Sequence, residues 1–357
     1  MQPSFTSLAF HLPQFHEIPE NDLWWGKGFT EWTKLRGART WSKRHVIRRP
    51  IAPLGEYDLT NPAALELQWD IAARHGIDGF AVWDYWFGDG KQLLERPLDI
   101  VLKQKLRFRY CFSWANHSWY DKSQNKLLCE QKYLGAADYQ RYFERCAAHF
   151  ETDNYVKIDS KPVFLIYDPP GIPELESFLE QWQGLARRRG FPGIYFVGDR
   201  LLAGNPVLQH FEKYSNSFNF MTRRNKLFVN FAKEHLQRLF SIDLGPRWFD
   251  FRRLVDEVIP AGATRQHAPT LVTGWDTTPR HGSRGMVYEH LDVAAFTRQL
   301  EVARTHFSNF RNTHHLLLVK SWNEWAEGNV LEPDSVFGFA MLEALRDFRS
   351  LEFAAVQ

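Results

Sequence analysis

The sequence predicts an α/β fold, a single-domain (β/α)8 barrel of the TIM type. Short β-branched or aromatic runs recur along the chain, and amphipathic helical segments follow most of them, as in the βα units of a parallel sheet. Eight such runs can be identified, which is the number that closes a barrel. The chain has 357 residues, a length at which such barrels form one domain.

Each predicted strand is a short run of residues that favour extended backbone. In chain order, strands are predicted at 7–11, 79–84, 109–115, 163–168, 194–199, 217–221, 270–276 and 315–322. The sixth run is short and lies in an irregular, insertion-like region at about 201–262, where two helices replace the simple pattern.

Helical patterns lie between the strands. The first begins with a cap at Asn61 and a proline at the next position, Pro62, which favours a helix start. Helices are predicted at 62–75, 91–104, 136–150, 174–190, 292–309 and 338–349. No linker-like composition and no internal repeat divides residues 1–357, so we expect one domain.

A doubly wound open sheet is the competing fold, because periodicity alone does not close a sheet. The dinucleotide-binding form of that fold carries G-x-G-x-x-G after its first strand, and the sequence has no such motif there. The barrel is therefore favoured.

The charge balance argues against a nucleic-acid partner. The formal net charge is +2, from 44 Lys and Arg against 42 Asp and Glu, so no strong field is directed at a polyanion. Aromatic content is high, at 15% with 14 Trp. Aromatic faces suit either a bulky core or a cleft for sugar rings.

The compartment is predicted from what the sequence lacks. The N-terminal MQPSFTSLAF shows no basic segment followed by a long apolar one, and no apolar run is long enough to span a membrane. Cys111, Cys129 and Cys146 have neither C-x-x-C nor zinc-ligand spacing and are interpreted as reduced thiols. We expect a cytoplasmic protein without a membrane span; the sequence does not indicate its oligomeric state.

Polar and Trp side chains follow the predicted strands. In a (β/α)8 barrel the active site is built at the C-terminal ends of the strands, so residues scattered in sequence would meet at one mouth. We expect substrate contacts from His11, Gln14, Trp83, Asp84, Trp86, Asn116, His117, Trp119, Trp275 and Asp276.

Other roles remain open for several of these residues. His11 is equally well explained as a satisfied buried histidine, and Asp84 as part of a structural ion pair. A metal site would have to use His11, His16, Asp84 and His117, which lack the spacing of H-E-x-x-H helices and have no Cys partners. No metal or other cofactor is therefore expected.

The segment SWNEWAEGNVLEPD, residues 321–334, carries the strongest chemical signal. Glu324 and Glu327 are three residues apart just after a predicted strand, and cleavage of an acetal needs two carboxyl groups. One group must hold a proton for the leaving oxygen while the other stays ionised. We expect Trp322 and Trp325 to wall the site, and Glu332 to hold the loop or contact a sugar hydroxyl. The alternative is that the glutamates only cap a helix or form salt bridges.

The chain resembles a known family in several long motifs. These are AFHLPQFHEIPENDLWWGKGFTEW (9–32), DGFAVWDYWFGDGKQLLERPLD (78–99), FSWANHSW (112–119), EQKY (130–133), KPVFLIYDP (161–169), VTGWDTTPRHG (272–282) and SWNEWAEGNVLEPD. Together they resemble the WbsX-like family, also described as glycoside hydrolase family 99-like and found with bacterial surface-polysaccharide genes. The match leaves about 201–262 unplaced.

The resemblance implies a (β/α)8 barrel and a distant relation to endo-acting α-mannosidases. It implies that Glu324 acts as a base on the sugar 2-hydroxyl, forming a 1,2-anhydro sugar, and that Glu327 acts as acid and then base, with net retention. One departure concerns the sugar: many relatives have an acidic residue after W-A-N, where this chain has His117.

Three functions follow as hypotheses. The leading one is a retaining glycosidase acting on an oligosaccharide or polysaccharide, with an α-mannoside-like substrate. The second is a glycosyltransferase or transglycosidase of surface-polysaccharide (O-antigen) biosynthesis, in which a sugar hydroxyl replaces water. The third is a glycan-binding barrel without chemistry, which would not need two closely placed carboxylates.

Overall fold

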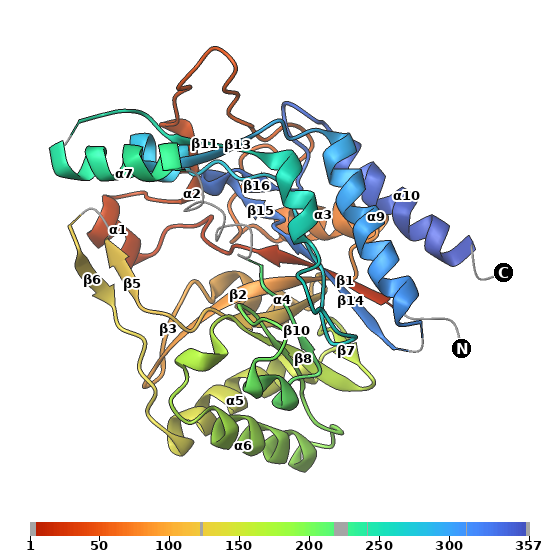
Figure 1. The fold of residues 1–357 in the computed structure, drawn as a ribbon. Coiled ribbons are helices and arrows are strands. Elements are labelled where there is room, and N and C mark those ends of the chain that lie inside the picture. The colour runs from red at the N-terminus through yellow and green to blue at the C-terminus, as the bar shows by residue number, and fades with distance from the viewer. Residues whose placement is uncertain (1–4, 122–123, 218–227, 241, 312, 355–357) are drawn as a thin grey trace.

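The computed structural model describes residues 5–121, 124–217, 228–240, 242–311 and 313–354. Its centre is a curled sheet whose strands run parallel to one another (Figure 1). In spatial order the strands are β10 (Lys213–Tyr214), β9 (Tyr195–Gly198), β8 (Lys161–Ile166), β4 (Tyr110–Trp114), β2 (Gly79–Gly88), β1 (Phe5–His11), β14 (His315–Lys320) and β12 (Thr270–Val272). Seven of the predicted strands coincide with members of this sheet.

The two ends of the strand order meet at Tyr214. Its backbone N–H donates to the carbonyl of Gln266 at 3.0 Å, and its carbonyl accepts from the N–H of Ala268 at 2.8 Å. Residues 266–268 lie directly before β12, so these bonds join β10 to the chain segment at the opposite end of the order. The prediction of a TIM-like barrel is confirmed over an open sheet.

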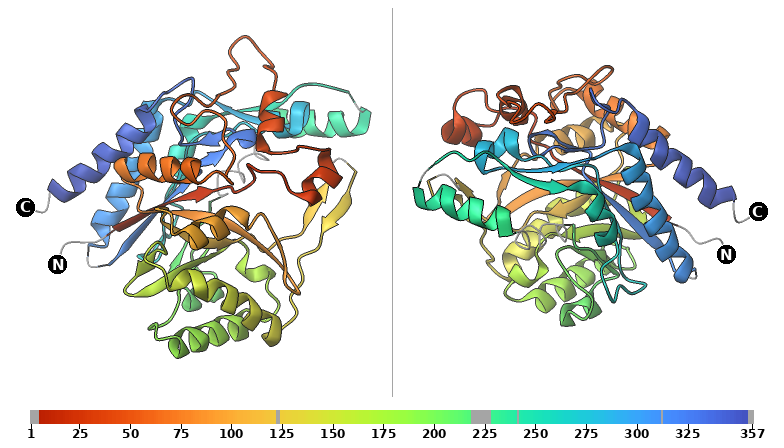
Figure 2. Two further views of the ribbon diagram at one scale, coloured as in Figure 1. Left: turned by 180° about the vertical axis from the view of Figure 1, so that it is seen from behind. Right: turned by 45° about the horizontal axis from the view of Figure 1, so that its top comes forward.

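Helices pack around the strands because each has one apolar face that needs burial. Their bounds are α3 (Pro62–Arg74), α4 (Arg96–Gln104), α5 (Ala136–Phe150), α6 (Leu175–Arg188), α9 (Val293–Asn309) and α10 (Ala340–Ala354). As predicted, Asn61 caps α3 by accepting from the N–H of Ala63. Figure 2 shows α5 and α6 on one side of the strands and α9 and α10 on the opposite side.

One predicted helix begins later than expected. Residues 91–93 form β3 (Lys91–Leu93), which pairs with the end of β2 in antiparallel fashion, and α4 starts only at Arg96. Pro97 is then in the first turn, where a missing N–H costs nothing. The prediction of helix from residue 91 is therefore wrong for its first five residues.

The irregular region contributes a small second sheet. Helix α7 (Phe228–Phe240) leads to β11 (Arg247–Asp250), which pairs in parallel with β13 (Met286–Glu289) beside α7 (Figure 1). Phe249 and Tyr288 from these strands pack in an apolar cluster with Val272 and Trp275. Most of the predicted strand 217–221 lies outside the described residues.

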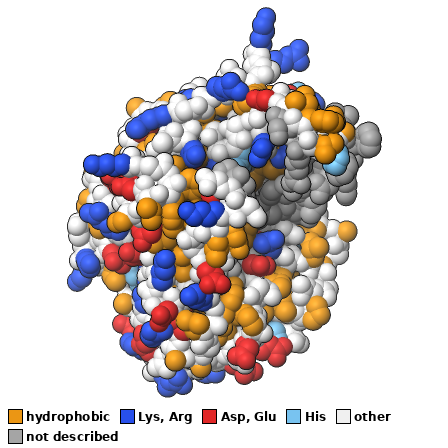
Figure 3. Space-filling model, turned by 90° about the vertical axis from the view of Figure 1, so that its left-hand side faces the viewer, with side chains coloured by type: hydrophobic (Ala, Val, Ile, Leu, Met, Phe, Trp, Pro, Cys, Tyr) orange, Lys and Arg blue, Asp and Glu red, His pale blue; other side chains and the backbone are white. Residues whose placement is uncertain are grey.

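Short elements complete the chain. They are α1 (Pro19–Trp25), α2 (Glu31–Arg36), α8 (Thr278–His281), β5 (Trp119–Asp121), β6 (Lys126–Cys129), β7 (Lys157–Ile158), β15 (Asn323–Glu324), β16 (Asn329–Val330) and 3-10 turns at Pro169–Gly171, Pro206–His210, Phe251–Glu257, Gly282–Arg284 and Trp325–Glu327. Figure 3 shows the left-hand side of Figure 1, toward which β1 points, with Lys and Arg interspersed among Asp and Glu. Within the described residues, no helix is both long and apolar enough to cross a membrane.

Candidate active site

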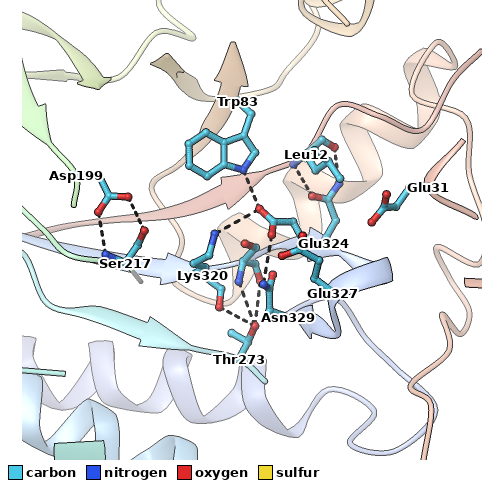
Figure 4. A network of polar contacts seen from close by, with 12 residues as sticks. Leu12, Glu31, Trp83, Asp199, Ser217, Thr273, Lys320, Glu324, Glu327 and Asn329 are labelled. Carbon is cyan, nitrogen blue, oxygen red and sulfur yellow. Dashed lines mark hydrogen bonds and ion pairs between the residues drawn. The ribbon is translucent and has the colours of Figure 1, made fainter. Parts of the chain in front are cut away.

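The two predicted catalytic carboxylates lie on a tight turn that follows strand β14, which lies between β1 and β12. Glu324 ends β15, Glu327 ends the 3-10 turn, and β16 returns antiparallel to β15. Gly328 makes this return possible because its φ is +63°, and a Cβ there would lie 2.7 Å from the Cβ of Asp276. Backbone geometry therefore turns both side chains into the same region (Figure 4).

Glu324 is held as an acceptor by groups from three places in the chain. Trp83 Nε1 donates to its Oε1 at 2.8 Å, and Asn329 Nδ2 donates to its Oε2 at 3.3 Å. Lys320 Nζ lies 3.6 Å from Oε1, and the side chains of Lys320 and Glu324 are only 1% and 8% exposed. Burial alone would raise the pKa of Glu324, but Lys320 and the Trp83 hydrogen bond outweigh it, so the pKa is lowered.

Glu327 has the opposite shift although it lies beside the same groups. Arg280 Nη1 donates to its Oε1 at 2.5 Å, and its side chain is 17% exposed. Burial raises the pKa of Glu327, the Arg280 charge counteracts this, and the neighbouring Glu324 charge raises the pKa further. The net direction is upward, so the pair consists of one carboxyl that favours ionisation and one that favours the proton.

Glu31 is a third buried carboxylate in the cluster, and the sequence analysis missed it. It accepts from Arg280 Nη2 at 2.9 Å and from the N–H of Ala326 at 2.9 Å, so it holds both the arginine and the catalytic turn. Its position at the start of α2, inside the motif FTEW, was the available signal, as was Arg280 in DTTPRHG. Neither Glu31 nor Arg280 lies close after a predicted strand, so a search of the C-terminal strand ends did not include them.

Strand β2 divides its side chains between the site and the helices, because successive residues of a strand point to opposite faces. Trp83 faces Glu324, whereas Asp84 accepts from Tyr142 at 2.5 Å and from Gln92 at 2.9 Å. Trp86 donates to Asp138 at 3.2 Å. The substrate contacts expected of Asp84 and Trp86 stay predictions. Both side chains are buried and hydrogen-bonded on the helix side of β2, and Arg145 lies 3.4 Å from Asp84, as in the ion-pair alternative.

Tyr85 also belongs to the inward-facing set, and strict alternation along β2 would have identified it. Burial raises the pKa of its hydroxyl, and the charges of Glu324, Arg280, Glu31 and Glu327 all act on it. Trp119 packs edge-on against its ring, with centroids 5.0 Å apart. Tyr85 thus lies next to the carboxylates, and Trp119 packs against Tyr85.

The residues after β4 have different surroundings. Asn116 joins two loops, since its amide nitrogen donates to Tyr133 Oη and the Asp168 carbonyl and its oxygen accepts from the Asp168 N–H. His117 is exposed, and its ring lies 5.1 Å from that of Tyr167. Asn116 is therefore committed to loop contacts, while His117 is accessible.

Asp276, which follows β12, contacts the turn that carries Glu324 and Glu327. The N–H of Asp276 donates to the carbonyl of Glu327 at 2.7 Å, and its carboxylate accepts from His45 at 2.8 Å and from Thr278 in the first turn of α8. Trp275 is buried, with its ring 5.8 Å from Lys320 Nζ. Asp276 thus positions the helix that carries Arg280.

A buried network lies beneath the turn and contains four of the predicted contact residues. Glu332 accepts from Tyr57, Gln68 and Trp325, and Gln68 also meets His11 at 3.1 Å. Trp322 is fully buried against Phe80. Trp322, Trp325, His11 and Glu332 are all buried, and the prediction that Trp322 and Trp325 wall a sugar site stays a prediction.

Burial also shifts the pKa values of two groups in this network. Burial lowers the pKa of His11 to about 4 and raises the pKa of Glu332 to about 7.

Gln14, another predicted contact residue, is partly exposed, and its backbone carbonyl accepts from the N–H of Glu31. Among the described residues, no group of three or more His, Cys, Asp or Glu is arranged to hold a metal ion.

Comparison with known proteins gives relatives for nearly the whole chain. A family model described as "Glycosyltransferase WbsX" matches residues 7–345. The protein WxcX of Xanthomonas campestris pv. campestris is 32% identical in strain B100 and 31% identical in a second strain, over 96% of this chain. Each alignment covers 49% of the relative, so the chain spans about half the length of the curated relatives it matches.

Solved structures share the fold. One described as a glycoside hydrolase-like protein has a TM-score of 0.57 at 15% identity, covering 97% of this chain and 94% of its own. The GH99 endo-alpha-mannosidase from Bacteroides thetaiotaomicron has a TM-score of 0.55 at 14% identity, covering 98% of each chain. Because the sequence identities are so low, these similarities show the barrel fold alone.

Proposed function

This chain belongs to the WbsX family, and from that premise and the geometry of its acidic site we propose that it is an enzyme that cleaves glycans with retention of configuration. The observation that carries the proposal is that two carboxyls on one turn have pKa values shifted in opposite directions. Lys320 and the Trp83 hydrogen bond lower the pKa of Glu324 against its burial, and burial raises the pKa of Glu327. Acetal cleavage needs this division, because one group must donate a proton while the other acts as the anion.

The two steps can be written with these groups alone. In the first, Glu324 takes the proton of the sugar 2-hydroxyl and O2 bonds to C1, while the bond from C1 to the leaving oxygen breaks and that oxygen takes the proton of Glu327. In the second, water bonds to C1 as the C1–O2 bond breaks, Glu327 receives the water proton, and Glu324 returns its proton to O2. Two inversions at C1 give net retention.

Arg280 and Tyr85 have supporting roles in this mechanism. Arg280 fixes one oxygen of Glu327 and leaves the other for the leaving group, while its second nitrogen binds Glu31. Tyr85 and Trp119 supply aromatic surface beside the carboxylates, which suits the C–H face of a sugar ring. The related folds include an endo-alpha-mannosidase, so α-mannosides are the first substrates to try.

The experiment is turnover of a panel of α-mannosides and bacterial surface-polysaccharide fragments, followed by mass spectrometry. Glu324→Gln and Glu327→Gln keep the shape of each side chain but remove its acid–base chemistry. Each is expected to lower kcat by at least about a hundredfold, the usual minimum contribution of a general acid or base. Glu343→Gln, on α10, is the control and should keep full activity. Full activity in both active-site variants would show that the carboxylates have no catalytic role.

Transfer to a sugar hydroxyl is the second candidate, and the family description as a glycosyltransferase favours it. The same two glutamates serve both reactions, because only the acceptor in the second step differs. Adding an oligosaccharide acceptor to the panel separates them. Elongated products indicate transfer, and products shortened by water addition indicate hydrolysis.

A further inference from the structure

A separate cavity of about 200 Å³ adjoins the catalytic turn. We call it the Trp248 pocket. Its lining includes the loop Arg44–Arg48, Trp248, Tyr288, Asp276 and Gly328, but neither Glu324 nor Glu327. The pocket is thus bounded on one side by the backbone that carries the catalytic pair.

The walls of the Trp248 pocket are aromatic. His45 meets the Trp248 ring edge-on, with centroids 5.4 Å apart at 87°. Tyr288 is held in place by stacking on Phe249, at 4.9 Å and 16°. In the parallel register of β11 and β13, Trp248 lies opposite Val287 and Phe249 opposite Tyr288, so Trp248 and Tyr288 point to opposite faces of the strand pair. The Tyr288 ring is buried against Phe249, and the partly exposed Trp248 is the ring of this pair that offers stacking surface.

The charged side chains that line the pocket are balanced in sign, with Arg44 and Arg48 against Asp276 and Glu289. Arg48 is also paired with Asp334 at 2.6 Å, and His45 contacts Asp276 at 2.8 Å. The lining therefore has no excess of cationic groups. A phosphate site would need cationic donors left over for the ligand. Aromatic walls with compensated polar groups fit a neutral, polyhydroxylated ring.

Hydrogen bonds through Asp276 also connect the pocket to Glu327, the proposed acid. Asp276 pairs with His45 in the pocket wall, caps α8 through the N–H and hydroxyl of Thr278, and donates its own N–H to the Glu327 carbonyl. Helix α8 carries Arg280, which binds the Glu327 carboxylate. A ligand that orders His45 and Asp276 therefore acts on both the backbone and the side-chain partner of Glu327.

We propose that the Trp248 pocket binds one further neutral sugar unit of the glycan, outside the catalytic subsite. This inference rests on the proposed function, which supplies the glycan. The volume of about 200 Å³ is smaller than the roughly 300–1,000 Å³ of pockets for whole drug-sized ligands, which fits a single ring. Binding there anchors the chain while Glu324 and Glu327 act on another bond.

The test uses substitutions with larger side chains at exposed residues that line the pocket opening. Val336 and Val46 line it and are 44% and 62% exposed, so Val336→Trp and Val46→Trp add bulk at the opening without disturbing the core. Leu202→Trp, at a 50% exposed position outside the lining, is the matched control. Saturation-transfer NMR is recorded with glucose, galactose, mannose, rhamnose, fucose and N-acetylglucosamine as probes, and with inorganic phosphate as competitor.

We expect at least one sugar to bind the wild type and the control, and to bind either filled variant about tenfold more weakly, a change of about 1.4 kcal/mol. Two filled variants guard against misfolding of one, which thermal melting detects. Equal binding of every sugar to all proteins overturns the proposal, as does displacement of the bound sugar by phosphate. Turnover by Glu324→Gln is measured separately: full turnover there refutes the proposed chemistry, while a loss of sugar binding in the filled variants still identifies the pocket.

Discussion

Lys320 Nζ lies 3.6 Å from Glu324 Oε1 in a region where both side chains are almost fully shielded from water. In low dielectric such a pair interacts strongly, and its main chemical consequence is the lowered pKa of Glu324. Strand β14, which ends at Lys320, thereby contributes the charge that lowers the pKa of Glu324. Four predictions follow from this and related contacts.

Lys320→Met should raise the pKa of Glu324, because burial of the carboxylate is then opposed by fewer charges. Activity that needs ionised Glu324 is lost as pH falls through its pKa, so the acidic limb of the kcat/KM profile should move to higher pH. Lys213→Met removes another buried lysine, one that donates to the Arg265 carbonyl, and should leave that limb in place. An acidic limb that stays fixed in Lys320→Met would contradict the role of Lys320.

Glu31→Gln should move the opposite limb. The Glu31 charge raises the pKa of Glu327, so its removal lowers that pKa. Protonated Glu327 is lost as pH rises through its pKa, and the alkaline limb should therefore shift to lower pH. Glu56→Gln, which breaks the surface pair with Arg36, is the control. An alkaline limb unchanged in Glu31→Gln, or shifted equally in both variants, would rule out the assigned coupling.

Trp83→Phe and Trp86→Phe form a matched pair on β2. Each loses one buried indole donor to a carboxylate, Glu324 or Asp138, so each should lose about 1.5–3 kcal/mol of unfolding free energy. Only Trp83→Phe should also lower kcat, by roughly tenfold or more, because its acceptor, Glu324, is the proposed base. Denaturant unfolding and turnover on the same samples check this. Equal kcat in the two variants would show that the Trp83 bond is structural.

Glu332 should make stability depend on pH. Burial raises its folded-state pKa from 4.5 to about 7, so the folded protein holds a proton that the unfolded chain releases. The associated stability is complete below pH 4.5 and is lost as pH rises to about 7, with a magnitude of about 3 kcal/mol. Glu332→Gln should flatten this slope in unfolding titrations, whereas Glu130→Gln, at an exposed site, should not. The same slope in all three proteins would contradict the raised pKa.

Apolar patterning predicted the barrel well, because buried parallel strands are continuous apolar runs and the helices between them are amphipathic. Helix α4 was misjudged at its start, since residues 91–93 pair with β2 through contacts that local sequence does not reveal. The arrangement at Tyr214 likewise depends on a partner more than fifty residues away.

The site was predicted less completely, for a physical reason. Strand-end position identified Trp83 and the Glu324–Glu327 pair, but it did not distinguish the inward face of β2 from its outward face, where Asp84 and Trp86 lie. Glu31 and Arg280 come from short helices outside the βα repeat, and only their shared contact reveals them. The high Trp content suited either a core or a sugar cleft, and composition alone could not show that Trp322 packs in the core.

The position of β1 has a consequence for synthesis of the protein. This strand is made first but lies between β2 and β14, and its partner β14 is made last of the barrel strands. During translation more than three hundred residues are synthesised between β1 and its partner β14. Until then the backbone groups on that edge of β1 have no strand to pair with. The nascent chain therefore exposes an unpaired strand edge with apolar side chains until β14 leaves the ribosome. We expect folding of the growing polypeptide to depend on chaperones for this reason.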